Sequence, residues 1–346
     1  MLRFLSAGES HGKVLIAILD GMVSNLSLSS ADLLLDLQRR QGGAGRGDRM
    51  KIEKDSAEII SGVRNGKTIG SPIGLLIPNR STEFFEKIVT IPRPGHADLA
   101  GAIKFNHQDI RNVLERASAR ETAARVAVGG IAKKFLTEFK ISISSSIVEI
   151  GGQNKKEAWE EAIAEAKTAG DTLGGEFTIR IEGCPVGLGS YTQWDLKLDG
   201  ILARALMSIP AIKGIEIGLG FEQTKIPGSK VHDEIFEDKG KIFRKTNNAG
   251  GLEGGVSNGQ PIILRAAMKP IATLTNPLNS VELTTKKPSK AYIERSDTSA
   301  VEAAAVVGEA MAAFEIANAL LLKFGGDSLE ETKNNFSAYQ KHSPMV

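Results

Sequence analysis

Polar and apolar residues alternate with a period of two in several short stretches of the chain, as they do in half-buried β-strands. The strongest hairpin signal joins the alternating segments 57–63 and 68–77 through Asn65-Gly66, a dipeptide that favours the backbone conformations of a tight hairpin turn. The remaining segments with a strand pattern are 2–7, 14–19, 141–150, 176–182, 214–220 and 262–267.

Other stretches place apolar residues three and four positions apart, which is the spacing of a helix face. Residues 30–40 begin at Ser30, a residue type that caps helix N-termini, and a charged amphipathic helix at 155–168 is predicted to end at Gly170. Residues 109–139 contain no proline, so we predict one long helix there, with an alanine-rich middle. A further helix is predicted at 196–207.

The most apolar stretch of the chain, 300–322, is long enough to cross a membrane but carries three acidic residues, Glu302, Glu309 and Glu315. A bilayer-spanning helix would hardly tolerate carboxylates at those depths. We therefore predict a buried core helix.

The order of these elements favours antiparallel sheets with helices packed on them, because strands and helices do not alternate strictly and hairpins come early. The fold class predicted is α+β. No repeat and no linker divides the chain, so we expect a single catalytic domain over 1–328 and a polar, frayed tail over 329–346. Segment 221–259 is too long for an ordinary connection, which favours a functional loop or lid.

Composition narrows the class of protein. Of the 346 residues, 41% are hydrophobic and 24% charged, as in soluble globular proteins. Because 43 basic residues face 41 acidic ones, there is no global field of the kind that binds nucleic acid or a membrane surface. The single cysteine, Cys184, cannot form an intrachain disulfide, and no signal-peptide pattern is present near residue 1, so we expect a cytoplasmic protein.

Arginine and glycine interleave over 39–49, where Arg39, Arg40, Arg46 and Arg49 surround four glycines. Glycine lets backbone N–H groups approach an anion closely, and guanidinium groups match carboxylate or phosphate oxygens in pairs. The segment favours an anion site. A flexible basic surface loop, or a polyanion-binding segment, is the alternative.

Two of the five histidines, His11 and His96, lie in short, turn-forming surroundings that can hold a side chain at the edge of a cleft. Either imidazole could act as an acid or base, or be an ordinary satisfied polar group. The spacing H-x-D occurs twice, at 96–98 and 107–109, and suits ligands of one metal ion. A metal-dependent phosphohydrolase that uses His96, Asp98, His107 and Asp109 is therefore the rival enzyme class.

Three further segments carry polar groups in suggestive places. On one long helix, Arg116 and Arg120 would share a face with Ser118 nearby and could hold an anion, or form a solvated face. The glycine-rich segment 247–259 permits close approach to a planar ligand or a phosphate, or is a flexible lid. Residues 294–298 place a carboxylate and a guanidinium before the core helix, as a site corner or a cap. Together these residues indicate an enzyme for a small, multiply anionic substrate, without specifying the reaction.

Colinear motifs from residue 4 to about 328 resemble those of the chorismate synthase family. The motifs are G-E-S-H-G at 8–12, R-R-Q-G-G-A-G-R-G-D-R-M at 39–50, R-P-G-H-A-D at 93–98, S-A-R-E-T-A at 118–123, G-D-T-L-G-G at 170–175, N-A-G-G-x-x-G-G at 248–255, E-R-S-D-T at 294–298 and A-A-V-V-G-E-A-M at 304–311. Their common order makes the resemblance far more specific than any one motif.

The resemblance implies a lyase of the shikimate pathway. Its members convert 5-enolpyruvylshikimate 3-phosphate to chorismate by removing phosphate from C3 and a hydrogen from C6, and they require reduced FMN although no net redox change occurs. The implied fold is a β-α-β sandwich, and the implied assembly is a homotetramer. NADPH as flavin reductant and an external flavin reductase are both left open.

The motifs also imply roles for residues of this chain. His11 resembles the histidine that protonates the departing phosphate, His96 the one that protonates reduced flavin, and Asp297 the carboxylate that assists deprotonation at flavin N5. The positions that match substrate-anion contacts are Ser10, Arg40, Arg46, Arg49, Arg93 and Arg120. The positions that match flavin contacts are Arg116, Ala117, Ser118, Pro210, Ala211, Gly254, Lys269, Pro270, Ile271, Ala272, Thr273 and Arg295. The family is also described as contacting NADP at the positions of Arg40 and Arg46. Contact with NADP is therefore an alternative to contact with substrate for these two side chains. No metal is implied.

The chain departs from the family pattern in two places. The usual K-Y-G is Lys104-Phe105-Asn106 here, which removes a phenol, and Ala117 stands where a serine is common. The missing hydroxyl at Ala117 puts one hydrogen bond to flavin or phosphate in doubt, while the proposed acids and base are untouched.

Overall fold

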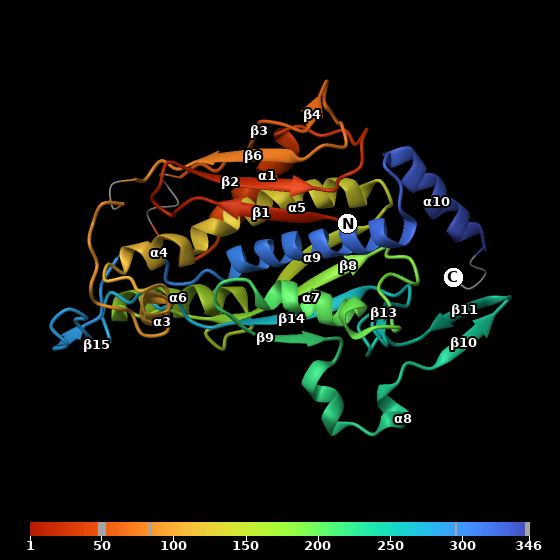
Figure 1. The fold of residues 1–346 in the computed structure, drawn as a ribbon. Helices are drawn as coiled ribbons and strands as arrows, with labels where there is room; N and C mark the ends of the chain where they lie inside the picture. The colour runs from red at the N-terminus through yellow and green to blue at the C-terminus, as the bar shows by residue number, and fades with distance from the viewer. Residues whose placement is uncertain (48–52, 83–84, 295, 343–346) are drawn as a thin grey trace.

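Two four-stranded antiparallel sheets enclose a layer of helices in the computed structural model (Figure 1). The structure describes residues 1–47, 53–82, 85–294 and 296–342. The first sheet has the order β1 (Arg3–Ala7), β2 (Val14–Asp20), β6 (Ile73–Pro78), β3 (Glu58–Ile59). The second has the order β7 (Ser142–Ile150), β8 (Gly175–Glu182), β14 (Ile262–Met268), β9 (Ile212–Ile217). The α+β sandwich predicted from the sequence is confirmed.

The hairpin predicted at Asn65-Gly66 joins β4 (Val63–Arg64) to β5 (Lys67–Thr68). Both turn residues have positive φ, 51° and 72°, as a tight hairpin turn requires. The prediction is confirmed, although the alternating segments around the turn divide, and only 58–59 and 73–78 join the larger sheet.

Three helices fill the space between the sheets: α1 (Ala31–Gln41), α5 (Thr122–Thr137) and α9 (Val301–Phe324). Gly129 of α5 lets the helices meet, because a Cβ there would lie 2.3 Å from the Cβ of Ala310 on α9. Helix α9 has the length and apolarity of a membrane span, but 89% of its most apolar window is buried inside the molecule. It is the core helix predicted, and α7 (Leu198–Met207) packs beside it.

The long helix predicted over 109–139 is wrong as a single element. Helix α4 (Arg111–Ala117) ends at Ser118, whose extended ψ of 142° interrupts it, and the chain resumes through η1 (Ala119–Glu121) into α5. The Ser118 hydroxyl accepts the backbone N–H of Arg120 and so starts the new turn, as an N-cap serine does. Arg116 and Arg120 therefore do not share a helix face.

The predicted end of one helix is confirmed, and the predicted cap of another is not. Helix α6 (Lys156–Ala169) ends at Gly170 in the left-handed conformation, as predicted. At α1, Ser30 makes no capping bond through its side chain, whereas Asp32 accepts both the backbone N–H and the hydroxyl of Ser29. The predicted cap by the Ser30 side chain is thus wrong, and Asp32, two residues later, bonds back to Ser29 instead.

Segment 221–259 contains short elements of its own. It holds most of η3 (Gly220–Lys225), then α8 (Gly228–Val231), β10 (Ile235–Asp238), β11 (Lys241–Arg244), β12 (Leu252–Glu253) and β13 (Val256–Ser257). Figure 1 shows α8 and the β10–β11 hairpin projecting from the sandwich. The role as a functional loop or lid stays a prediction.

The expected frayed tail is wrong for most of its length. Residues 329–342 form α10 (Leu329–His342), and its Phe336 packs against Phe324 and Phe139, with ring centroids 5.1 and 5.2 Å apart. One buried aromatic side chain anchors an otherwise polar helix. Further elements that the sequence did not predict are α3 (Asp98–Phe105), η2 (Trp194–Leu196), β15 (Asn279–Val281) and β16 (Pro288–Lys290).

Candidate active site

The turn between β1 and β2 buries Ser10 and His11 against α4. The backbone N–H of His11 donates to Glu115 Oε2 at 2.6 Å, and His11 Nδ1 lies 2.9 Å from Glu115 Oε1. Ser10 donates its N–H to the Glu115 carbonyl at 2.9 Å and its hydroxyl to Ser118 Oγ at 3.0 Å. Burial would raise the pKa of the Glu115 carboxyl, but the hydrogen bonds and charge of His11, with a bond from Arg111, lower that pKa below its ordinary value.

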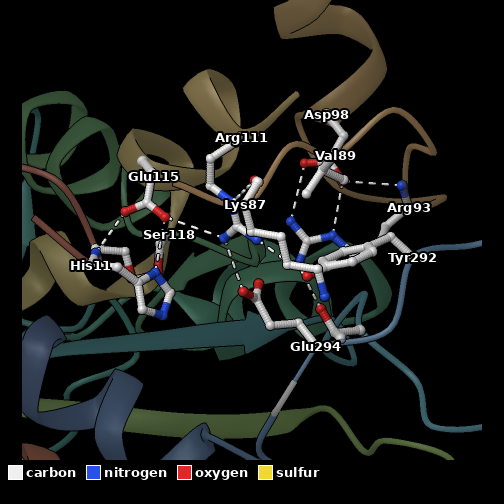
Figure 2. A network of polar contacts seen from close by, with 12 residues as sticks. His11, Lys87, Val89, Arg93, Asp98, Arg111, Glu115, Ser118, Tyr292 and Glu294 are labelled. Carbon is white, nitrogen blue, oxygen red and sulfur yellow. Dashed lines mark hydrogen bonds and ion pairs between the residues drawn. The ribbon is translucent and has the colours of Figure 1, made fainter. Parts of the chain in front are cut away.

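Arg111 lies behind this pair and links it to a distant segment. Its Nη1 donates to Glu115 Oε1 at 3.2 Å and to Glu294 Oε1 at 2.9 Å. Its Nη2 donates to the hydroxyl of Tyr292 at 3.2 Å, and its Nε to the carbonyl of Lys87 at 3.0 Å. Figure 2 shows the continuous chain of contacts from His11 through Glu115 and Arg111 to Glu294.

The second predicted histidine, His96, lies in the turn before α3 within another ion cluster. Its Nδ1 lies 2.5 Å from Asp98 Oδ1 and 3.1 Å from Arg93 Nη2. Arg93 also donates to Asp98 Oδ2 at 2.8 Å and to the hydroxyl of Thr273 at 2.8 Å. Burial opposes ionisation of Asp98, but bonds from His96 and Arg93 outweigh it and hold the pKa of this carboxyl well below its usual range.

Two predicted anion-binding arginines, Arg40 and Arg120, are buried and share the carboxylate of Asp55. Arg40 Nη2 lies 2.6 Å from Asp55 Oδ2, and Arg120 Nη1 lies 2.5 Å from Asp55 Oδ1. Arg120 Nε donates to the Asn79 side chain at 2.8 Å. The amide nitrogen of Asn79 in turn donates to two carbonyls of the turn 8–12. The arginine pair and the His11 turn are therefore one connected structure.

The glycine-rich segment brings Arg46 to Asp297, the predicted base. Arg46 Nη1 lies 2.6 Å from Asp297 Oδ2, and the N–H of Gly47 donates to Asp297 Oδ1 at 2.6 Å. The segment lies flat on the residues before α9, because Gly45 has a φ of 79° and a Cβ there would be 2.9 Å from the nitrogen of Ser299. Glycine at 45 is required by both the backbone angle and the close approach.

Several buried donors at this place have no hydrogen-bond partner among the described residues: Arg40 Nε, Arg46 Nε and the hydroxyl of Ser299. Burial lowers the pKa of Arg40, the charge of Asp55 opposes this, and the charges of Arg120 and Arg46 lower it further. Three guanidinium groups thus gather with fewer acceptors than donors, an arrangement that suits an anion with several oxygens.

The residues matched to flavin contacts come together in part. Lys269 donates its N–H to the Ala211 carbonyl at 2.9 Å, and Thr273 bonds Arg93 as described. Gly95, next to His96, faces Ala272 and Lys269 Nζ, each 3.8 Å from where its Cβ would be. Burial lowers the pKa of Lys269, and the like charge of nearby Lys213 lowers it further. These two lysine side chains therefore form a cationic patch beside His96.

Other members of that set lie elsewhere or differ in surroundings. Gly254 lies in the turn between β12 and β13, before the start of β14, while Lys269 follows the end of β14, and a strand of seven residues spans about 20 Å (Figure 1). Arg116 is directed to the carbonyls of Ser6 and Gly8. Ala117 packs beside a small apolar cluster, and the carbonyl of Ile271 accepts from Thr172. Pro210 directly precedes Ala211, whereas Arg49 and Arg295 lie outside the described residues.

The metal site considered from the H-x-D spacing does not assemble. The carboxylate of Asp109 accepts the N–H groups of Val89 and Arg111, and the ring of His107 stacks on Phe105. Among the described residues, no group of three or more His, Cys, Asp or Glu side chains is arranged to hold a metal ion. The spacing instead reflects the ion pair at 96–98.

Sequence reasoning missed the carboxylates that organise the site. These are Asp55, Glu115 and Glu294, which meet their partners from 15 to 183 residues away. The sequence places Glu294 only in a polar corner before the core helix. No local signal marks these carboxylates, because each lies close to other charged residues in the sequence.

Buried arginines whose donors lack acceptors among the described residues, beside an imidazole held by a carboxylate, are typical of an enzyme site that binds an anion.

Comparison with known proteins identifies the family. A model of the chorismate synthase family matches residues 2–321. The chain is 58% identical over 343 residues to the chorismate synthase of Thermoanaerobacter pseudethanolicus, covering 98% of each, and 52% identical over 389 residues to that of Aquifex aeolicus, covering 99% and 98%. A crystal structure of chorismate synthase superposes with a TM-score of 0.82 at 45% identity, covering 99% of this chain and 98% of the other. The chain belongs to the chorismate synthase family.

The activity follows from that membership. The protein is a carbon–oxygen lyase that acts on a phosphate, and it catalyses the last step of the shikimate pathway. The metal-dependent phosphohydrolase and the polyanion-binding protein, considered from the sequence, are thereby set aside.

Proposed function

We propose that the site described above eliminates phosphate and the C6 hydrogen from 5-enolpyruvylshikimate 3-phosphate in the presence of reduced FMN, and that His11 is the acid for the leaving phosphate. The observation that carries the proposal is the position of His11, which is bonded to a buried carboxylate and connected through Asn79 to the Arg40–Arg120 pair. An imidazolium at this place can both neutralise a phosphate and give it a proton.

The arginines supply the anion contacts. A substrate with a phosphate and two carboxylates would offer acceptors to Arg40 Nε and Arg46 Nε, which have none among the described residues. Arg93 and Arg120 stay candidates for the remaining anionic groups, and so does Arg49. NADP is the competing ligand of Arg40 and Arg46, and competition between NADP and substrate in a binding assay would separate the two uses.

The surroundings of His96 fit a flavin. Gly95 brings the His96 turn within van der Waals reach of Ala272 and Lys269, and Lys269 beside Lys213 forms a cationic patch of the kind that holds a phosphate. When bound, reduced flavin supplies electron density that helps phosphate leave and takes part in removing the C6 hydrogen. His96 would hold a proton toward the flavin, and the carboxylate of Asp297 would accept one. Arg116, Ser118, Pro210, Ala211 and Lys269–Thr273 are the proposed contacts.

A homotetramer is the proposed assembly. Exposed Leu5, Ile18 and Ile60 form an apolar row across the outer face of the first sheet, since Leu5 pairs with Ile18, Ile18 with Gly74, and Ile60 bonds Gly74. Such a row favours burial against another chain. Gly254 is also too far along the second sheet to reach the flavin residues of its own chain, so its contact would come from another copy. Sedimentation of Ile18→Asp as a smaller species would support this assembly, and an unchanged species would contradict it.

The cytoplasm is the proposed location, because the chain belongs to a family of biosynthetic enzymes. Reduction of the flavin by the protein itself, with NADPH, is the alternative to supply by an external reductase. Turnover with oxidised FMN and NADPH alone would favour self-reduction.

His11→Ala tests the proposed acid. Turnover should fall about 10²-fold or more, because the leaving phosphate then departs without a proton, while reduced FMN should still bind. Cys184→Ser is the matched control, since Cys184 is buried and outside the site. Wild-type turnover by His11→Ala would remove His11 from the mechanism, and joint loss of turnover and FMN binding would assign it to the flavin instead.

A further inference from the structure

The His11 turn is held by a buried ion network whose members are not assigned to substrate or flavin contacts. Glu115 uses both carboxylate oxygens on His11, one on the backbone N–H at 2.6 Å and one on Nδ1 at 2.9 Å. The side chains of His11 and Glu115 are 6% and 4% exposed, so water competes little for these bonds. Burying a carboxylate costs free energy unless well-placed hydrogen-bond donors offset that cost. The two bonds from His11 to Glu115 provide such donors.

We propose that Glu115 is a positioning residue that holds the imidazole of His11 as a proton donor. Arg111 extends the contact to Glu294, and so joins the turn that carries the acid to the segment that carries Asp297. The inference rests on the proposed role of His11 and deepens it, because it states what keeps the acid charged and oriented.

The geometry assigns separate tasks to the two ring nitrogens. A carboxylate can only accept, so Nδ1 carries a proton directed at Glu115. Figure 2 shows the other ring nitrogen on the far side of the imidazole from Glu115. Nε2 of His11 faces away from Glu115 and is the atom we assign to deliver the proton, and a histidine whose tautomer is fixed through Nδ1 does not have to reorient before it reacts.

Arg111 helps to keep the Glu115 carboxylate charged. It donates to Oε1 of Glu115, the same oxygen that accepts from His11 Nδ1. The guanidinium stabilises the carboxylate charge, so Glu115 does not take the proton from His11. Arg111 is itself fixed by Tyr292 and by the carbonyl of Lys87, so a lysine cannot replace its several directed bonds.

Glu294 makes the network a bridge between the two halves of the site. It is separated from Asp297 by two residues and bonds Arg111 at 2.9 Å, with side chains 3% and 10% exposed. A shift of Glu294 would therefore change a partner of Arg111 and, through it, Glu115.

The charged groups that face His11 give the expected pH behaviour. They are Glu115 and Arg111 from α4, with Arg116 of the same helix bonded to the carbonyl of Gly8. A general acid must be protonated, so activity falls at alkaline pH. Removing the negative charge of Glu115 makes the imidazolium give up its proton more easily, which shifts this fall to lower pH.

The test compares Glu115→Gln and Glu115→Asp with wild type. In Glu115→Gln, kcat should fall between about 10- and 100-fold, and the alkaline limb of the kcat profile should move to lower pH by about one unit or more. Glu115→Asp keeps the charge and should keep the limb near its wild-type position. Glu309→Gln is the matched control, because Glu309 is an equally buried glutamate with basic partners outside the site. Its limb should not move.

A second readout does not depend on turnover. In protein without flavin, the imidazole nitrogens of His11, identified by their absence in His11→Ala, should titrate at lower pH in Glu115→Gln than in wild type. Glu294→Gln should lower kcat by itself but add little in the double variant with Glu115→Gln, because both act through Arg111.

The outcomes separate this inference from the proposed function. Loss of turnover in His11→Ala with an unshifted limb in Glu115→Gln would overturn the positioning role alone. An equal shift in Glu309→Gln would also overturn it, by showing a general effect of buried charge. Full turnover in His11→Ala would overturn both.

Discussion

Two buried glutamates, Glu309 in the core helix and Glu115 beside the candidate site, are built alike but have different partners. Glu309 accepts from two permanently charged side chains and a hydroxyl, those of Arg39, Lys133 and Ser145. Glu115 accepts from Arg111 and from a histidine, which can lose its charge. The first network is closed by fixed charges and serves stability, whereas the second contains a group that can exchange a proton.

Adjacent arginines of α1 repeat the contrast. The two terminal nitrogens of Arg39 donate to the carboxylates of Glu309 and Asp36. Arg40, the next residue, is almost fully buried and leaves its Nε without a partner among the described residues. Unsatisfied donors beside a titratable group distinguish the functional cluster from the structural one.

The largest effect is expected from Glu309→Ala. The free energy of unfolding should fall by about 3 to 5 kcal/mol, because buried and half-buried cations lose their main acceptor. Urea denaturation measures this. A loss below about 1 kcal/mol would mean that Asp36, which also bonds both cations, holds the network without Glu309.

Arg40→Ala should lower kcat/KM about 100-fold, since the substrate loses a charge-assisted contact in a buried site. Arg39→Ala is the matched variant one residue away, and its kcat/KM should stay within about threefold of wild type while its unfolding midpoint falls. Steady-state kinetics at a temperature where both variants are folded decides the comparison. Equal losses in the two would show that the cluster at Arg40 is no more functional than the one at Arg39.

Acid should weaken the Glu309 network in a defined window. Burial opposes ionisation, but the bond to Arg39 and the charge of Lys133 lower the pKa of Glu309 to about 2, against an ordinary 4.5. A pKa lowered by folding contributes stability above the ordinary value, and this contribution is lost as pH falls toward the folded value. About 2 kcal/mol should be lost between pH 5 and pH 3. Glu309→Gln should lack this component of the decrease in urea denaturation, and an identical decrease would contradict the assignment.

The smallest effect is expected at the exposed pair of Arg3 and Asp20, whose Arg3 side chain is 78% exposed. Arg3→Ala should change the free energy of unfolding by less than about 0.5 kcal/mol, because water already solvates both charges. Thermal denaturation at low and high salt provides the measurement. A larger, salt-sensitive loss would show that exposed charges contribute more to this fold than the comparison of buried clusters assumes.

Much of the fold could be predicted from local patterns. The strands at β1, β2, β7 and β8, the turn at Asn65-Gly66 and the end of α6 at Gly170 follow from alternation, dipeptide preference and a left-handed glycine. The break at Ser118 could not, because neither proline nor glycine marks it and tertiary contacts with Ser10 select its conformation. The helix at 329–342 was missed because one buried Phe336 outweighs a polar sequence.

The basic and imidazole groups of the candidate site and Asp297 were predicted from the sequence, whereas the carboxylates that hold the histidine and the arginines were missed. His11, Arg40 and Arg46 lie in motifs whose composition indicates anion chemistry. Their carboxylate partners lie far along the chain, as Glu115 does at 104 residues from His11, and no local spacing reveals such a pair. Long-range ion pairs are fixed by the packing of α4 against the first turn, which only the folded chain specifies.

The most direct test of the account is anaerobic turnover of 5-enolpyruvylshikimate 3-phosphate with chemically reduced FMN and then with oxidised FMN, in the absence of any reductant. Chorismate absorbance and released phosphate are followed together in wild type and in His11→Ala. The account predicts equal amounts of chorismate and phosphate with reduced FMN only, and almost none of either in His11→Ala. Phosphate without chorismate, or turnover indifferent to the flavin's redox state, would contradict it.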